Sequence, residues 1–265
     1  MAISQIKYLI FLICLSCLPI YSTYGQSSYK YKVEESPKGL VLTKWKGKET
    51  KINFNNDSLL KRVKIIGAMA FEMNDHIEEV ILPEGVEVLE KRAFNTCANL
   101  HKIYLPNSIR FIGASAFNMC RNLELSELPS NLEEIGNWAF WDCKKVSISV
   151  IPENVKRIGM KAFVCCNIHE IKLPEDLEVI EDRLFARCEQ LQKVIFPKNL
   201  KRISECAFAS CKKLERIELP NTVTNIDWWA FADCISLKTV ILHSKPEISP
   251  DAFRNCNIIY IGEKQ

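Results

Sequence analysis

Cysteine is the residue type with the most chemical potential in this chain, and most of its copies are regularly spaced. Eight of the twelve cysteines recur every 22 or 23 residues: Cys97, Cys120, Cys143, Cys166, Cys188, Cys211, Cys234 and Cys256. Cysteine-rich exported chains often form disulfides. Equivalent residues on stacked strands lie about 4.8 Å apart with parallel Cβ vectors, whereas a disulfide needs facing Cβ atoms about 3.8 Å apart. The spacing favours a column of buried, unpaired thiols over the alternative, a ladder of disulfides.

Other chemistry finds little support. Cys165 and Cys206 lie outside the column and are the candidate reactive thiols. The repeated cysteines lack the close C-x-x-C spacing of a structural zinc site. The four histidines stand outside any motif, and no nucleophile elbow, phosphate-binding glycine loop, H-E-x-x-H or calcium loop occurs. The sequence therefore predicts no metal site, no cofactor and no enzymatic activity.

The cysteines are one position of a longer repeat. A phenylalanine precedes each cysteine by three residues, and an additional coil carries Asn74 in place of the cysteine. The nine phenylalanines are Phe71, Phe94, Phe117, Phe140, Phe163, Phe185, Phe208, Phe231 and Phe253. One turn reads LxxIxLPxxVxxIGxxAFxxCxx. A period of this length indicates a solenoid, in which each coil buries its apolar side chains against the next.

This string resembles the BspA-like class of bacterial leucine-rich repeats over roughly residues 40–262. The resemblance implies a mostly β repeat solenoid, a curved leucine-rich repeat with parallel strands and short helical turns behind a small β-rich N-terminal cap. It also implies a surface or secreted interaction protein, since some members are adhesins. It identifies no ligand.

The repeat predicts how each coil is built. LxxIxLP reads as a parallel strand that the proline ends, and Ala-Phe-x-x-Cys as one helical or 3₁₀ turn. Gly67, Gly113, Gly136 and Gly159 suit a bend with positive φ. We expect a cap at 26–61 and the solenoid at 62–265. We also expect the final strand, Ile258 to Ile261, to leave a bare edge that could pair with another chain.

Residues 1–25 read as a secretory signal peptide. Lys7 is the only charged residue in a segment that is otherwise mostly apolar, and we expect cleavage after Gly25. A lipoprotein signal with lipidation at Cys17 is the alternative. Of the 35 basic residues only Lys7 falls in this segment, so the rest nearly balance the 32 acidic ones. The sequence thus predicts an exported protein, on the cell surface, in the periplasm or secreted. It predicts no transmembrane span in the mature chain and no nucleic-acid partner.

The outward positions of the predicted strands are the candidate binding site. Alternation places one set of side chains on the solvent face of the sheet: Ile81, Lys102, Tyr104, Leu125, Glu127, Ile148, Val150, Lys172 and Ile195. The apolar members from Tyr104 to Val150 would form an exposed patch of the kind that marks an interaction site. A local register change is the alternative: it would turn Leu125, Ile148 and Val150 inward and Ser126 and Ser149 outward.

Tryptophans flank two of the Ala-Phe pairs: Trp138, Trp141, Trp228 and Trp229. Such side chains could stack on sugars or anchor a protein partner; shielding between coils is the simpler interpretation. We therefore predict a secreted or cell-surface adhesion protein that uses the concave sheet to bind an unidentified protein. The alternative is a glycan-binding surface module that uses these tryptophans.

Overall fold

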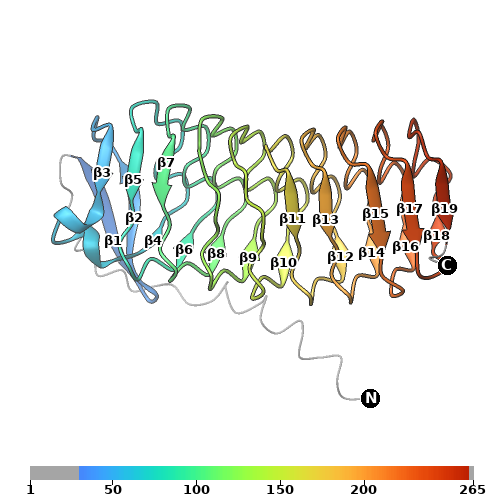
Figure 1. Cartoon of the computed structure of the whole chain (residues 1–265). Helices are drawn as coiled ribbons and strands as arrows, with labels where there is room; N and C mark the ends of the chain where they lie inside the picture. The colour runs from blue at the N-terminus through green and yellow to red at the C-terminus, as the bar shows by residue number, and fades with distance from the viewer. Residues whose placement is uncertain (1–29, 263–265) are drawn as a thin grey trace, which may run out of the picture.

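The computed structural model describes residues 30–262 of the chain. The predicted signal peptide, its cleavage site and Cys17 lie outside the described residues. Within them the chain winds into a β-solenoid whose coils stack along one axis (Figure 1). Each coil is named below by the phenylalanine of its Ala-Phe pair. The predicted fold class, a mostly β repeat solenoid, is confirmed.

Most LxxIxLP segments form strands of a first row, as predicted, and a strand from the predicted cap joins the row. Its members are β3 (Lys51–Asn53), β5 (Glu79–Ile81), β7 (Lys102–Tyr104), β11 (Glu170–Lys172), β13 (Lys193–Ile195), β15 (Arg216–Leu219), β17 (Thr239–Leu242) and β19 (Tyr260–Gly262). They pair in parallel as β3-β5-β7, β11-β13 and β15-β17-β19. The Phe117 and Phe140 coils separate β7 from β11, and the only pairing there among the described residues is an isolated bridge between Val150 and Lys172.

A second row of strands, which the sequence analysis did not predict, forms from the V-x-x-I segments. Its members are β4 (Val63–Ile66), β6 (Val88–Leu89), β8 (Phe111–Ile112), β9 (Glu134–Ile135), β10 (Arg157–Ile158), β12 (Val179–Ile180), β14 (Arg202–Ile203), β16 (Asn225–Ile226) and β18 (Glu247–Ile248). Most of these strands pair through only two residues, in parallel with the next coil. So short a segment lacks the alternation that would reveal a strand.

An antiparallel hairpin, β1 (Tyr31–Ser36) with β2 (Gly39–Trp45), precedes the coils. β2 then pairs in parallel with β4, so the hairpin continues the second row. Two 3₁₀ turns, η1 (Phe54–Asn56) and η2 (Leu60–Arg62), follow β3. The predicted division at residues 61 and 62 stays a prediction.

The phenylalanines form one continuous stack inside the solenoid. Eight successive ring pairs from Phe71 to Phe253 are parallel, with centroids 4.7–5.7 Å apart and planes within 15°. All but the last ring are almost fully buried. Trp45 and Tyr31 extend the stack into the hairpin. Successive coils are therefore equivalent in space, as the repeat required.

The Ala-Phe-x-x-Cys segment is not the predicted helical turn. The residues two before and two after the phenylalanine have φ of 54–63° in nearly every coil, as at Arg92 and Thr96. Alternating signs of φ point every second amide toward the next coil, while the amides between them donate within their own coil. Phe94 N donates to the Ala116 carbonyl and Thr96 N to the Asn118 carbonyl of the next coil, at 2.8 and 2.7 Å. The turn is thus a ladder between coils, which we call the Ala-Phe edge.

The expectation of positive φ at the four repeat glycines is wrong. In the described residues, only Gly39 and Gly85 among the glycines have positive φ. Gly136 is instead needed because the preceding coil is close: a Cβ there would lie 2.5 Å from Ala114 N. The left-handed positions are occupied by residues such as Arg92, whose conformational cost of about 1–2 kcal/mol is offset by the hydrogen bonds between coils.

Candidate functional site

The outward side of the first row, which we call the strand face, presents one regular column of side chains. Strand pairing aligns Ile81 with Tyr104, and Val150 with Lys172 and Ile195. The repeat places Glu127 between Tyr104 and Val150. From Tyr104 to Ile195 the column therefore alternates between uncharged and charged residues over five coils, and Ile81 precedes Tyr104 in the coil before.

Three apolar members of the column are exposed. Tyr104 has 44% of its surface exposed, Val150 48% and Ile195 37%. Lys102, beside Tyr104, holds its ammonium group 4.7 Å from the centre of the tyrosine ring. Tyr104 gives the main contribution to raising the Lys102 pKa above its usual value. The lysine thus stays charged at neutral pH and is positioned by the aromatic face.

Leu125 and Ile148 do not lie on the strand face, so their assignment to the binding site is wrong. Leu125 is 8% exposed and Ile148 fully buried. In these two coils the residue expected to face the core is a serine, Ser126 or Ser149, which cannot fill an apolar interior. The chain turns the preceding apolar residue inward instead, and the serines are exposed. Val150 nevertheless stays outward, so the register change covers only part of each segment.

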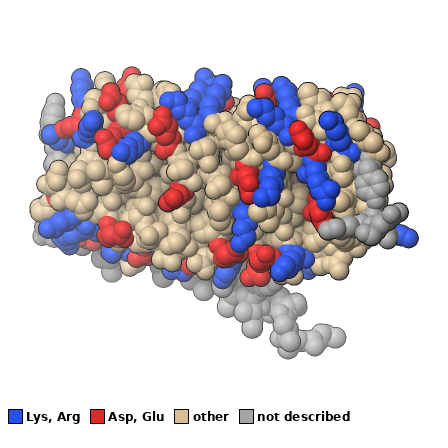
Figure 2. Space-filling model, in the orientation of Figure 1, with Lys and Arg blue, Asp and Glu red and all other residues tan. Residues whose placement is uncertain are grey.

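This change also explains the missing strands between β7 and β11. The turned segments keep single backbone bonds to their neighbours, such as Ser147 N to the Leu125 carbonyl at 2.9 Å, but no continuous ladder. Ser147, which the sequence analysis did not single out, is exposed there as well. In Figure 2 charged side chains are sparse over the middle coils and denser over the coils toward the C-terminus. Within the column, the charged residue of these coils is Glu127, which is exposed between Tyr104 and Val150.

Charged pairs cross between neighbouring coils elsewhere on this face. Lys193 Nζ lies 2.9 Å from a Glu170 carboxylate oxygen, and Lys172 Nζ 2.6 Å from Glu153. The hydrogen bond from Lys172 holds the pKa of Glu153 below its usual value. Both pairs are solvent-exposed, so each contributes little to stability.

The four tryptophans divide into two kinds. Trp138 and Trp141 are half-buried, and Lys161 Nζ lies 5.4 Å from the centre of the Trp138 ring. Trp228 and Trp229 are exposed and meet edge to face with centroids 6.2 Å apart. The second pair is the more accessible to a ligand.

The repeated cysteines line the interior beside the phenylalanine stack. Each Sγ donates to the carbonyl of the phenylalanine in the preceding coil, as from Cys143 to Phe117 at 3.0 Å. The other seven make the same contact at 3.0–3.4 Å. Cys256 differs from the expected column in being only half-buried. Every cysteine among residues 30–262 is unpaired, including the half-buried Cys165 and Cys206.

Asn74 replaces the cysteine of the Phe71 coil and forms different bonds. Its side-chain oxygen accepts from the backbone of His76 and Ile77 at 3.0 and 3.1 Å. Among the described residues, no three metal-binding side chains gather into a possible metal site. No helix in the described part is long and apolar enough to span a bilayer.

These features agree with comparisons to known proteins. The family model described as the BspA type leucine rich repeat region matches residues 49–164 and 142–260 in six copies. The chain therefore belongs to the BspA-type leucine-rich repeat family. No curated protein matches it.

Two crystal structures are among those that resemble this solenoid. A leucine-rich repeat protein from T. pallidum is 28% identical with a TM-score of 0.63, over 71% of this chain and 89% of the other. A leucine-rich repeat protein from Bacteroides ovatus is 23% identical with a TM-score of 0.70, over 89% of this chain and 78% of the other. At 23% identity, the likeness to the Bacteroides ovatus protein shows a shared fold. Leucine-rich repeat solenoids are typically non-enzymatic and suited to protein interaction.

Proposed function

We propose that this protein is a secreted or surface-displayed adhesion protein that binds another protein through the strand face. The observation that carries the proposal is the exposure of Tyr104, Val150 and Ile195 in one column of the strand face. Aromatic and aliphatic anchors ringed by charged groups are typical of protein interfaces. Lys102 beside Tyr104, and Glu127 and Lys172 between the apolar anchors, would supply the charged contacts.

Charging the column tests the proposal. Tyr104→Glu combined with Val150→Lys places charges at exposed positions, so binding to a partner captured from the native environment should fall at least tenfold while the melting curve stays unchanged. The matched control is Glu84→Lys with Lys201→Glu, two exposed positions outside the column. Unchanged binding by the Tyr104 and Val150 variant would place the contact elsewhere.

Trp228 and Trp229 support a second candidate function, a glycan-binding surface module. Their exposed rings, with planes at 62°, offer two faces on which sugar rings could stack. A glycan array probed with the wild type and with Trp228→Ala/Trp229→Ala separates this function from protein adhesion. Signals that persist in the variant would count against these two residues, though not against Trp138 and Trp141.

Export is part of the same proposal. The signal-peptide character of residues 1–25 supports it, with cleavage after Gly25 favoured over lipidation at Cys17. Mass spectrometry of the mature protein distinguishes the two: a chain that begins at Gln26 supports cleavage, and a lipid-modified Cys17 supports anchoring.

We further propose self-association through the final coil. Within residues 30–262, β19 pairs only with β17, and Ile259 and Ile261 are exposed beside it. Unpaired strand edges favour association. Light scattering after size-exclusion chromatography should reveal a concentration-dependent dimer that Ile259→Asp abolishes; a monomer at high concentration would contradict this part.

A further inference from the structure

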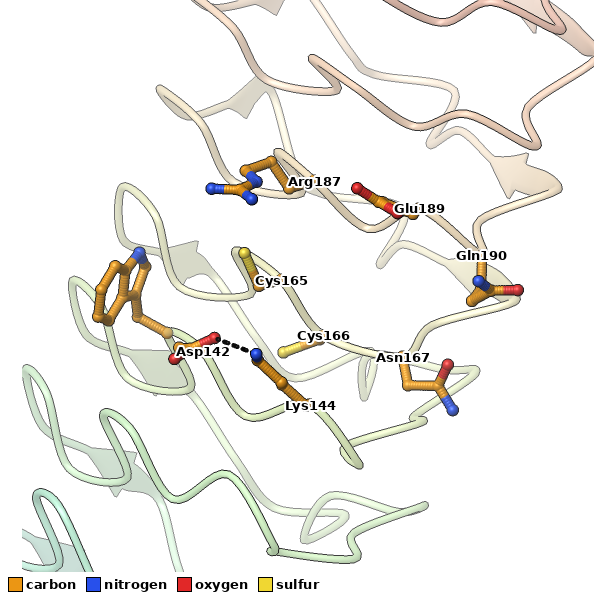
Figure 3. Close-up of a pocket in the computed structure, with 9 residues that line it drawn as sticks. Asp142, Lys144, Cys165, Cys166, Asn167, Arg187, Glu189 and Gln190 are labelled. Carbon is orange, nitrogen blue, oxygen red and sulfur yellow. Dashed lines mark ion pairs between the residues drawn. The ribbon is translucent and has the colours of Figure 1, made fainter. Parts of the chain in front are cut away.

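A groove of about 500 Å³ crosses three successive coils beside the Ala-Phe edge (Figure 3). Its lining residues immediately follow Phe140, Phe163 and Phe185, and none of them belongs to a strand. The groove is therefore separate from the strand face, and an inference about it stands apart from the proposed protein binding. Its size is in the range of small-ligand sites.

The groove exists because the middle coil is one residue short. The Phe163 coil has 22 residues, and a single residue, Asn167, separates Cys166 from the next core residue, Ile168. The coils on either side have two residues there, Lys144-Lys145 and Glu189-Gln190. The missing residue leaves a hollow between the two longer turns.

A decrease in side-chain size from one coil to the next two forms one wall of the hollow. Trp141 follows its phenylalanine directly, and the equivalent residues in the next two coils are the buried Val164 and Ala186. The next two coils therefore carry no large side chain at the position of Trp141. The indole of Trp141 lines the groove. An aromatic face next to polar groups is a common platform for a ring-shaped polar ligand.

The charges of the groove leave one cation without an anion. Asp142 lies 2.7 Å from Arg121 and 3.9 Å from Lys144, and Glu189 lies 2.9 Å from Lys212. Arg187 lines the same groove and is exposed, yet it makes no ion pair with any of residues 30–262. Both acidic groups are thus neutralised while a guanidinium, which favours two-point contact with a carboxylate, is available.

Two side-chain amides in the groove also lack partners among the described residues. Asn167 and Gln190 make no side-chain hydrogen bond there. Asn257 occupies the same position as Asn167 in the other Cys-Asn-Ile turn, and its side chain donates to the Ile235 carbonyl at 2.7 Å. The amide of Asn167 is therefore free for a ligand where its equivalent is used to hold two coils together.

We propose that this groove binds a sugar that carries a carboxylate, such as a uronic acid unit of a glycan. The carboxylate contacts Arg187 and the ring of the same unit lies against Trp141, whereas the amides of Asn167 and Gln190, at the other side of the groove in Figure 3, meet hydroxyl groups of a neighbouring unit of the glycan. A simple anion would not need the indole or the amides. A neutral sugar would leave the guanidinium unused.

Calorimetric titration of the intact chain with three probes tests this assignment. The probes are a galacturonate tetramer, a neutral galactose tetramer and a glutamate tetrapeptide. We expect the galacturonate to bind at least tenfold more tightly than either of the others. Equal binding of the peptide would overturn the sugar assignment in favour of an acidic peptide, and equal binding of neutral galactose would overturn the role of the carboxylate.

Two variants with matched controls locate the site. Arg187→Gln should weaken galacturonate binding about 10- to 100-fold, because it removes a charge-assisted contact. Arg62→Gln, an exposed arginine in η2, should have no effect. Trp141→Ala should weaken binding, whereas Met73→Ala, at an exposed apolar residue of the Phe71 coil, should not. Unchanged binding by Arg187→Gln would overturn the proposal.

Cys165 gives a test that needs no variant. Its thiol lines the groove, and Cys206 is a similarly half-buried thiol outside it. Bound galacturonate should slow iodoacetamide labelling of Cys165 several-fold and leave Cys206 unaffected, as read by peptide mass spectrometry. Equal labelling of Cys165 with and without a saturating ligand would place the ligand elsewhere.

Discussion

The Ala-Phe edge and the strand face are two regions of the same coils, and they differ in regularity. At the edge, nearly every coil repeats the same pair of left-handed residues and the same backbone bonds to the next coil. On the strand face, pairing is continuous in some coils and reduced to the Val150–Lys172 bridge in the middle. The edge, the phenylalanine stack and the thiol bonds hold the coils together, which leaves the strand face free to vary.

The interior beside the edge should be sensitive to alkaline pH, the largest effect we expect. Bonds to neighbouring cysteines, together with burial, raise the pKa of Cys97 and Cys234. Burial raises the pKa of Cys143, Cys166 and Cys188. The folded state keeps these thiols protonated, while the unfolded chain ionises near pH 8.5. Stability is therefore complete below that pH and falls above it, by about 1.4 kcal/mol per thiol at pH 9.5.

Urea denaturation between pH 7.5 and 9.5 measures this dependence. Cys143→Ala should lower stability at pH 7.5 yet reduce the loss on going to pH 9.5 by about 1.4 kcal/mol. A free energy of unfolding that stays flat across this range would contradict the column of protonated, buried thiols.

A charge placed in the middle coils should distinguish the buried side of the first-row segments from their outward side, the strand face. Ile148→Lys removes a fully buried side chain and introduces an unpaired charge, so it should cost about 5 kcal/mol. Val150→Lys, two residues away and exposed, should change stability by less than about 0.5 kcal/mol. Similar unfolding free energies for the two variants would mean that Ile148 faces solvent after all.

Removing one ring measures how much the stack contributes. Phe140→Ala should cost about 3–5 kcal/mol, because the ring is fully buried between two parallel neighbours. Phe253→Ala should cost less, since that ring is only partly buried and stacks on Phe231 in the described part. Calorimetry of both variants makes the comparison, and an equal loss would show that the stack does not act through burial.

An ion pair on the strand face should contribute least to the free energy of unfolding. Lys193→Ala removes the contact with Glu170 between two exposed side chains, so stability should change by less than about 1 kcal/mol. Added salt should reduce the difference in stability between the wild type and Lys193→Ala further. A larger, salt-independent loss would indicate that the lysine stem packs on the face as well.

The difference in regularity between the two regions explains which features of the fold could be predicted from the sequence. The phenylalanine and cysteine positions recur in nearly every coil, so their stacking followed from the period alone. The positions with positive φ could not be predicted in this way, because Met69, Arg92 and Trp138 share no residue type that marks positive φ. The glycines indicated a conformation that they do not adopt, since close approach of the preceding coil selects them instead.

The candidate site could be predicted only in part. Alternation identified Tyr104, Val150 and Ile195 correctly as outward residues, but it cannot determine whether the second or the third residue after Leu123 fills the core. The serines at 126 and 149 were the signal for the correct choice. The groove depends on a residue that is missing, and the short spacing from Cys166 to Ile168 was the sign that could have located it.

The near-identical fit of one ring on the next has a consequence for how such a protein changes length. Because the ring of each coil stacks on the equivalent ring of the next coil at 4.7–5.7 Å, a tandem duplication of one whole coil introduces no new type of ring contact. Copies of the Phe94 coil would lengthen the rod and nothing more. A copy of the Phe163 coil would instead place two short turns side by side and lengthen the hollow, while Trp141 and Arg187, which lie on the flanking coils, would stay single but move one coil further apart.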